Sequence, residues 1–340
     1  MYPWKDNGVS ILRVLRIGVI GAGHMGSNHV RNLSEEKRFD LVGIYDLSSE
    51  QAKTVAEKYD VKAFETAEEL LKNIEAVVIA VPSSLHKEVA LKAAAYSVHA
   101  LIEKPLATSS EDAEVISRTF EEKNLLLAVG HIERFNPVFR ELKKLTDPDD
   151  VFYIEACRYS PYNVSGRITD TTVVEDLMIH DVDLVCALME GREITSLHGR
   201  GEAVISGRTD FATCLMDFGG KCHAVVNASR VSQGRERSIT VHKKDSCIHA
   251  DLLAKTLEIY KSASLNIDST ESNSYKQDGI VKRVYVPIEE PLRAELVAFY
   301  NAVVHGTPVE VNGDVGIRAI KICETVAHRA EAGNQEEIAK

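Results

Sequence analysis

The stretch that decides the fold lies near the start of the chain, where residues 15–26 read LRIGVIGAGHMG. Its first half is an apolar run with the length of a buried strand, and a helix-like segment starts near His24. Between them Gly21, Gly23 and Gly26 have the spacing G-x-G-x-x-G. In this context the first glycine permits a tight turn, the second lets a phosphate approach the backbone, and the third allows close packing of helix and strand. The stretch therefore predicts a strand–turn–helix unit that holds a diphosphate at the N-terminus of the helix.

A carboxylate follows the next expected strand at the distance that a dinucleotide site requires. Asp46 comes directly after the strand-like run Leu41–Tyr45 and 20 residues after Gly26. A carboxylate at this place accepts hydrogen bonds from ribose hydroxyls and repels a 2′-phosphate. The spacing therefore predicts a site for NAD rather than NADP, and we expect His24 and Met25 of the glycine loop to contact the same cofactor.

Strand-like and helix-like segments alternate through the first third of the chain. Further strands are expected in the apolar runs Ala76–Val81, His99–Ile102 and Leu125–Val129. Runs that are apolar on both faces suit the buried strands of a parallel sheet, and the helical segments between them complete β-α-β units. We therefore expect an α/β Rossmann domain, a doubly wound parallel sheet, over residues 15–135, preceded by a tail at residues 1–14.

The pattern changes after a turn segment at Asp147–Asp150, beyond which β-rich runs predominate. The expected strands are Val151–Tyr159, Phe211–Phe218, His223–Arg230, Ser238–His242 and Ile248–Asp251. The expected helices are Thr172–Glu190, Pro291–His305 and Gly313–Ala332. Together they predict an α+β domain with an open, mostly antiparallel sheet over residues 136–340, whose C-terminal helix packs back on the first domain.

The composition is that of an ordinary globular protein with an acidic balance. The chain has 340 residues, enough for two domains, with 44% hydrophobic residues and a formal net charge of −11. This charge argues against nucleic-acid binding, which needs an excess of Lys and Arg. The six cysteines form no C-x-x-C pair, which argues against a metal site and for reduced thiols in a cytoplasmic protein. The sequence lacks the run of about 18 apolar residues that a membrane span needs, so we expect no membrane partner.

Four further motifs come in a fixed order along the chain. They are VPSSLH at Val81–His86, EKP at Glu103–Pro105, GHIERFNP at Gly130–Pro137 and DLMIHDVD at Asp176–Asp183. Together with the glycine loop, this ordered set makes the chain resemble the glucose–fructose oxidoreductase and inositol dehydrogenase family, also called Gfo/Idh/MocA. The resemblance extends over nearly the whole chain. It implies a Rossmann domain followed by an open-sheet domain, with the active site between the two.

The resemblance also implies roles for residues of these motifs in an NAD-dependent dehydrogenase that acts on a sugar hydroxyl. Lys104, Asp176 and His180 are the implied catalytic residues. Hydride transfer from a secondary alcohol needs a base for the hydroxyl proton, and histidine exchanges protons near neutral pH. A lysine can bind the same oxygen and stabilise alkoxide charge, and whether His180 or Lys104 is the base stays open at this point. Asp176 and His180 are four residues apart, which places both on one face of an α-helix. The residues of the other motifs that the resemblance places at the cofactor are Pro82, Ser83, His86, Glu103 and Lys104.

The GHIERFNP motif resembles the subgroup that oxidises nucleotide-activated amino sugars, which implies UDP-N-acetylglucosamine, oxidised at carbon 3, as the substrate. The residues expected to contact it are Arg134, Asn136, Arg158 and Tyr162. A diphosphate also needs cationic partners, for which Arg167, Arg230, Arg235 and Arg237 are further candidates. Two alternatives stay open: an inositol, free-sugar or dihydrodiol dehydrogenase of the same family, and a non-catalytic NAD-binding sensor or regulator.

An open sheet leaves apolar surface and strand edges uncovered. We therefore expect a homodimer or homotetramer that is built on the sheet of the second domain.

Overall fold

The computed structural model describes residues 13–161, 171–262 and 279–332. The chain forms two compact units, each made of several segments. Unit 1 comprises Met1–Lys104, Glu114–Gly130 and Leu292–Gly313, and unit 2 comprises Pro105–Ala113, His131–Pro291 and Asp314–Lys340. The expected division at residues 135 and 136 gives each domain one continuous segment, whereas here the chain returns to unit 1 after residue 291. Most of the expected tail at residues 1–14 lies outside the described residues.

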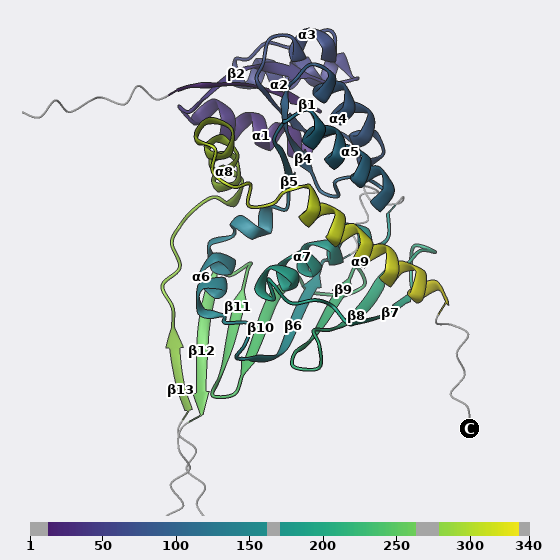
Figure 1. Ribbon diagram of the computed structural model, residues 1–340, viewed down its shortest axis with the longest axis vertical. Coiled ribbons are helices and arrows are strands. Elements are labelled where there is room, and N and C mark those ends of the chain that lie inside the picture. The colour runs from purple at the N-terminus through teal and green to yellow at the C-terminus, as the bar shows by residue number, and fades with distance from the viewer. Residues whose placement is uncertain (1–12, 162–170, 263–278, 333–340) are drawn as a thin grey trace, which may run out of the picture. The chain divides into compact units, whose positions relative to one another are not determined.

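Unit 1 contains a five-stranded parallel sheet with the order β2-β1-β3-β4-β5 (Figure 1). Its strands are β1 (Leu15–Ile20), β2 (Phe39–Tyr45), β3 (Ala76–Ile79), β4 (His99–Glu103) and β5 (Leu127–Gly130). The chain steps from β1 to β2 on one side and then crosses to β3 on the other side of β1. The carboxyl ends of β1 and β3 therefore flank the topological switch point, where ligands bind in doubly wound sheets. The predicted Rossmann fold is confirmed.

Helices connect the strands of this sheet and cover it. They are α1 (His24–Glu35), α2 (Ser49–Tyr59), α3 (Ala67–Leu71), α4 (His86–Ala95) and α5 (Ser110–Glu122). The side chains of Ser48 and Thr66 cap α2 and α3 by accepting hydrogen bonds from backbone N–H groups in their first turns. A late helix, α8 (Pro291–His305), adds Leu296 and Phe299 to the core that β1 and α1 build. The helix that rejoins the Rossmann sheet is therefore α8, whereas most of α9 (Gly313–Ala332) belongs to unit 2.

Unit 2 contains an eight-stranded sheet with the order β13-β12-β11-β10-β6-β9-β8-β7. Its strands are β6 (Val151–Tyr159), β7 (Ser196–Glu202), β8 (Phe211–Asp217), β9 (His223–Ser229), β10 (Glu236–Lys243), β11 (Ser246–Asp251), β12 (Thr256–Ser262) and β13 (Gly279–Arg283). All neighbours pair antiparallel except β6 and β9. The helices α6 (Pro137–Leu145), α7 (Ile179–Leu188) and α9 lie on one face (Figure 1). The expected open, mostly antiparallel sheet is therefore present, and it is larger than expected.

Four elements of unit 2 were not predicted, and the reasons differ. In β7, Gly199 and Gly201 leave room for α9. A Cβ on Gly199 would lie 2.9 Å from the Cα of Val326 in that helix. The strand thus lacks the apolar alternation that reveals a strand in a sequence. The exposed strand β13 and its neighbour β12 are also weakly apolar. The helix α6 did have a signal, because Asn136 caps it and Pro137 stands in its first turn.

Candidate cofactor site and active-site residues

The glycine loop between β1 and α1 accepts no larger side chain at two of its three glycines. Gly21 has φ +108°, and a Cβ there would lie 2.3 Å from the carbonyl oxygen of Ala80. A Cβ on Gly26 would lie 1.9 Å from the carbonyl oxygen of Gly21. At Gly23, by contrast, no described atom lies within 4 Å of a Cβ position. The backbone is therefore compact beneath the loop and open above Gly23, as the approach of a pyrophosphate requires.

The side chain of Asp46 connects the glycine loop to the turn after β2 through hydrogen bonds. Its Oδ2 accepts a hydrogen bond of 2.6 Å from the backbone N–H of Ala22, and its Oδ1 one of 2.7 Å from that of Ser48. A cavity of about 200 Å³ opens beside it, and Ile20, Tyr45 and Val81 are among the residues that line it. These line it from the ends of β1 and β2 and from just beyond β3, so the cavity lies at the switch point. The open loop, the carboxylate and the cavity together fit NAD. That Asp46 contacts its adenosine half stays a prediction.

The turn after β3 is held by His86. Its imidazole is buried, and Nε2 lies 2.9 Å from the carbonyl oxygen of Val81. This contact spans Pro82 and Ser83, which lie between the two residues on the surface of unit 1. His24, at the start of α1, is exposed, and its Nε2 lies 3.4 Å from the side-chain nitrogen of Asn28. Contact of His24, Met25, Pro82, Ser83 and His86 with the cofactor stays a prediction.

Lys104 follows the end of β4 and is half-buried. The residue before it, Glu103, is buried and lies 2.7 Å from Nε2 of His29 on α1. A second carboxyl, Glu295 of α8, is 2% exposed, and neither of its oxygens has a hydrogen-bond partner among the described residues. Burial and the charge of Glu103 raise the pKa of Glu295 well above its ordinary value. The strand end that precedes Lys104 is thus in contact with His29 of α1, and the charge of Glu103 acts on Glu295 of α8.

The other two expected catalytic residues lie in unit 2, where a π-helical turn joins α7. The turn, η3, covers Val174–Met178 and contains Asp176, and His180 is the second residue of α7. Both side chains are half-buried. Turns of this kind occur often at functional sites. The prediction of one shared face assumed α-helical spacing, which the structure replaces by π-helical spacing between Asp176 and Met178.

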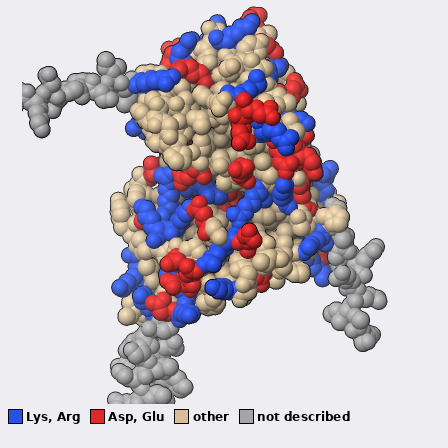
Figure 2. Space-filling view, viewed as in Figure 1, with Lys and Arg blue, Asp and Glu red and all other residues tan. Residues whose placement is uncertain are grey.

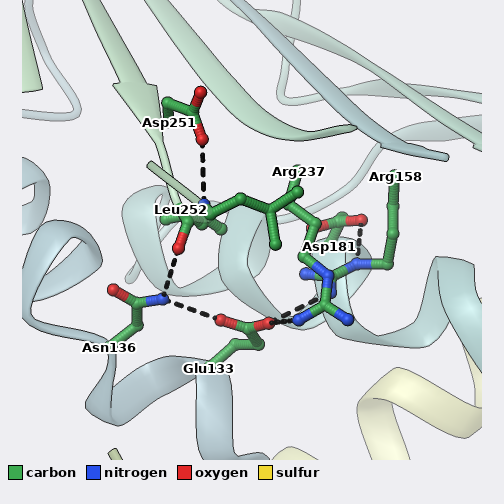
Figure 3. A network of polar contacts seen from close by, with 8 residues as sticks. Glu133, Asn136, Arg158, Asp181, Arg237, Asp251 and Leu252 are labelled. Carbon is green, nitrogen blue, oxygen red and sulfur yellow. Dashed lines mark hydrogen bonds and ion pairs between the residues drawn. The ribbon is translucent and has the colours of Figure 1, made fainter. Parts of the chain in front are cut away.

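Three arginines, two on neighbouring strands and one directly after a third strand, pair with acidic residues around this helix, and we call Arg158, Arg230 and Arg237 the arginine row. Arg158 of β6 is paired across the sheet with Arg237 of β10 and with Ala228 of β9, two residues before Arg230. Arg158 binds Asp181 through two hydrogen bonds of 2.7 and 2.8 Å. Arg158 and Arg237 each donate 3.0 Å bonds to Oε1 of Glu133 (Figure 3).

In this network, neighbouring charges offset the cost of burial for Arg158 and Glu133, whereas at Asp181 burial outweighs the charge of Arg158 and raises the pKa of the carboxyl. Burial would lower the pKa of Arg158, which is 1% exposed, but the neighbouring Asp181 and Glu133 raise it. Burial would likewise raise the pKa of Glu133, and the charges of Arg158 and Arg237 lower it. The network therefore stabilises the charges of Arg158 and Glu133 in the interior of unit 2. Its third buried member, Asp181, directly follows His180 in the sequence.

The expected substrate-contacting residues that the structure describes make contacts within unit 2. Arg134 donates bonds of 2.6 and 2.7 Å to the carboxylate of Asp183, and Asn136 caps α6 and donates to Glu133. Arg158 is committed to Asp181 and Glu133. These contacts are structural, so they do not favour a role of Arg134, Asn136 and Arg158 in substrate binding. Tyr162 and Arg167 lie outside the described residues, and Arg235 and Arg237 are exposed.

Other features of the described residues bear on the kind of site. They contain no cluster of His, Cys, Asp and Glu that could hold a metal ion. None of the described helices is both long and apolar enough to cross a lipid bilayer. Basic and acidic side chains intermingle on the face shown in Figure 2.

Comparison with known proteins agrees with this reading. The family model described as "Oxidoreductase family, NAD-binding Rossmann fold" matches residues 15–131, and that described as "GFO/IDH/MocA C-terminal domain" matches residues 151–248. The chain is 32% identical to UDP-N-acetylglucosamine 3-dehydrogenase of Acidithiobacillus ferrooxidans over 94% of this chain and 98% of that protein. A solved structure of that enzyme covers 94% of this chain and 99% of its own, with a TM-score of 0.84.

Two further relatives differ in the substrates that they are named for. Glucose-6-phosphate 3-dehydrogenase of Bacillus subtilis is 35% identical over 60% of this chain and 62% of its own length. Myo-inositol 2-dehydrogenase of Thermotoga maritima is 25% identical over 90% of this chain and 93% of its own length. The glycine loop, the Rossmann sheet, the open sheet and these matches agree, and the chain belongs to the GFO/IDH/MocA family of NAD-binding oxidoreductases.

Proposed function

We propose that the protein is a dehydrogenase that oxidises carbon 3 of UDP-N-acetylglucosamine with NAD as hydride acceptor. The observation that carries this proposal is the match to an enzyme with this activity over nearly the full length of both chains, in sequence and in fold. The match includes both units, so it extends beyond the cofactor-binding part that the whole family shares. The preference for NAD over NADP is supported by the carboxylate of Asp46 beside the cavity in unit 1.

The side chains named from the sequence supply the chemistry that this reaction needs. NAD, when bound, accepts the hydride. His180 removes the proton of the sugar hydroxyl, because an imidazole can take up a proton near neutral pH. Lys104 binds the same oxygen and stabilises the negative charge that develops on it. Asp176 orients His180 or the substrate, and the π-helical turn fixes where its carboxylate lies.

A second candidate within the same family is an enzyme for another polyol or sugar. The relatives named for glucose 6-phosphate and myo-inositol support it, at lower coverage in one case and lower identity in the other. A non-catalytic NAD-binding sensor is less well supported, because Lys104, Asp176 and His180 are all present and partly exposed.

We also propose that copies of the chain associate through the face of the unit 2 sheet that lies opposite its helices. Side chains on this face include Tyr153, Leu215, His223 and Tyr260, of which Leu215 and Tyr260 are 37% and 41% exposed. An uncovered sheet face with apolar side chains favours pairing with a second copy as a homodimer or homotetramer. Light scattering at micromolar concentration tests the association, and a monomer would contradict it.

The cysteines support a cytoplasmic location. All six are free thiols, as suits a cytoplasmic protein.

A substrate panel tests the proposed function. Purified protein is incubated with NAD and, separately, with UDP-N-acetylglucosamine, UDP-glucose, glucose 6-phosphate and myo-inositol, and NADH absorbance is followed. We expect the highest kcat/KM with UDP-N-acetylglucosamine and a 3-keto sugar as the product. Faster oxidation of glucose 6-phosphate or myo-inositol would favour the second candidate, and NAD binding without turnover on any of the four would favour a sensor.

A further inference from the structure

Arg230, the first residue after β9, is almost completely buried and reaches the segment that carries Asp176. Its Nη1 donates a 2.7 Å hydrogen bond to the carbonyl oxygen of Thr171. Its Nη2 lies 3.1 Å from the carbonyl oxygen of Thr172 and 3.2 Å from Oδ2 of Asp176. One guanidinium group therefore binds both the backbone that enters the π-helical turn and the carboxylate inside that turn.

The backbone around Arg230 is fixed at the same place. The N–H of Arg230 donates to the carbonyl oxygen of Asp210, and the N–H of Val173 donates to that of Thr209. The adjacent carbonyl groups of Thr209 and Asp210 thus bind the backbone at the entrance of the turn and the backbone of Arg230, respectively. This double attachment fixes the backbone of Arg230 relative to the backbone that enters the turn.

The pair of Arg230 and Asp176 differs from the other buried pair of the arginine row. The side chains of Arg158 and Asp181 are 2% and 1% exposed, so both charges are enclosed. The side chain of Arg230 is 3% exposed, but that of Asp176 is 28% exposed. Arg158 therefore binds a carboxylate in the interior, whereas the buried Arg230 binds a carboxylate that is partly exposed to solvent.

We propose that Arg230 is a positioning residue that acts on catalysis through Asp176, an inference that rests on the proposed function. It fixes the carboxylate on the exposed side of the π-helical turn, so that Asp176 reaches the substrate or His180 without rearrangement. The role requires arginine, because only a planar fork presents nitrogens to two separate sites at the same time. A lysine in its place supplies the charge but a single nitrogen.

A double-mutant cycle between the two residues tests this role. The variants are Arg230→Gln, Arg230→Lys, Asp176→Asn and the combinations with Asp176→Asn, all assayed with NAD and UDP-N-acetylglucosamine. Hydrogen bonds to charged groups contribute amounts that correspond to about 10–100-fold, and we expect Arg230→Gln to lose about this much in kcat with a smaller change in KM. Arg230→Lys should recover part of the loss. Arg230→Gln combined with Asp176→Asn should be no slower than Asp176→Asn alone, because residues that act through each other do not add.

The control variant is Thr171→Val, which removes the 3.2 Å contact between Thr171 Oγ1 and Nη2 of Arg230 and leaves the contact with Asp176 in place. We expect it to keep the kcat of the unmodified protein. Melting curves show which variants are folded, and the cycle with Arg230→Lys replaces that with Arg230→Gln if the latter does not fold.

The outcomes separate the inference from the proposed function. Losses that add in the double variant would overturn the positioning role and leave the proposed reaction intact. Equal loss in Thr171→Val would also overturn it, since the effect would then come from the backbone segment as a whole. Full activity of Asp176→Asn would overturn the catalytic role of Asp176 and the role of Arg230 together.

Discussion

The glycine loop of unit 1 and the arginine row of unit 2 are built on opposite principles. The loop works through missing side chains, since Gly21 and Gly26 let the backbone pack closely and Gly23 faces open space. The arginine row works through long, charged side chains that pair with Glu133, Asp176 and Asp181. The loop is made within six consecutive residues, whereas the row joins residues that are up to 104 positions apart. A backbone site can thus be recognised in a short sequence, but a side-chain network cannot.

The comparison also assigns different tasks to the two regions. Unit 1 carries the groups expected to bind the cofactor together with Lys104, and unit 2 carries Asp176 and His180, the proposed base, beside the arginine row. The predictions below separate these tasks, starting from the change with the largest expected effect.

The first prediction concerns His180. Removal of a general base typically costs about 10²–10⁴-fold in rate, so His180→Ala should lose about this much in kcat. NAD affinity, measured by fluorescence titration, should stay near that of the unmodified protein, because the cofactor-binding groups named above lie in unit 1. If NAD binding falls as much as turnover, the division of tasks between the two regions is wrong.

The second prediction concerns the enclosed pair of the arginine row. Arg158→Met leaves the carboxylate of Asp181 buried without its partner, and breaking such a pair costs about 3–5 kcal/mol in the free energy of unfolding. Replacing both residues, as in Arg158→Met with Asp181→Leu, should recover much of the loss because no unpaired charge remains. Urea unfolding measures both variants. A single variant as stable as the unmodified protein would show that the row does not stabilise unit 2.

The third prediction concerns Asp46. Asp46→Ser removes the charge that disfavours a 2′-phosphate and the acceptor for Ala22 N–H. NAD should bind about tenfold more weakly, the scale of one hydrogen bond to a charged group, and the preference for NAD over NADP should largely disappear. Isothermal titration with both cofactors measures this. An unmodified protein that prefers NADP would contradict the expected role of this carboxylate.

The fourth prediction concerns the pH dependence of stability in unit 1. The pKa of Glu295 is raised in the folded state by burial and by Glu103, above the ordinary value of 4.5. The folded state then holds a proton that the unfolded state releases, so stability falls as the pH rises from 4.5 up to the folded pKa, by at most about 1.4 kcal/mol per pH unit. Glu295→Gln stays neutral, so its melting temperature relative to the unmodified protein should rise between pH 5 and pH 8. A constant difference across this range would show that Glu295 does not titrate in this way.

The sequence predicted unit 1 well because its signals are local. The glycine loop, Asp46 and the bounds of α8 were all expected within a few residues. For unit 2 the sequence predicted the fold class, an α+β domain with a mostly antiparallel sheet, but not all of its elements. The strand β7 was missed because its glycines make room for α9, a contact between residues more than 100 positions apart. The arginines were expected at a diphosphate, but the sequence does not show that Asp181 and Asp183 lie beside Arg158 and Arg134. Pairing of this kind depends on the register of a sheet that no short motif encodes.

The most direct test of the proposed reaction follows the hydrogen on carbon 3 of the sugar. UDP-N-acetylglucosamine that carries deuterium at carbon 3 is incubated with the protein and NAD, and the reduced cofactor is analysed by mass spectrometry, with a substrate deuterated at carbon 4 as the control. If the enzyme oxidises carbon 3, the reduced cofactor from the first substrate contains deuterium and that from the control does not. Reduced cofactor without deuterium from the carbon 3 substrate, or with deuterium from the carbon 4 substrate, would contradict the proposed function.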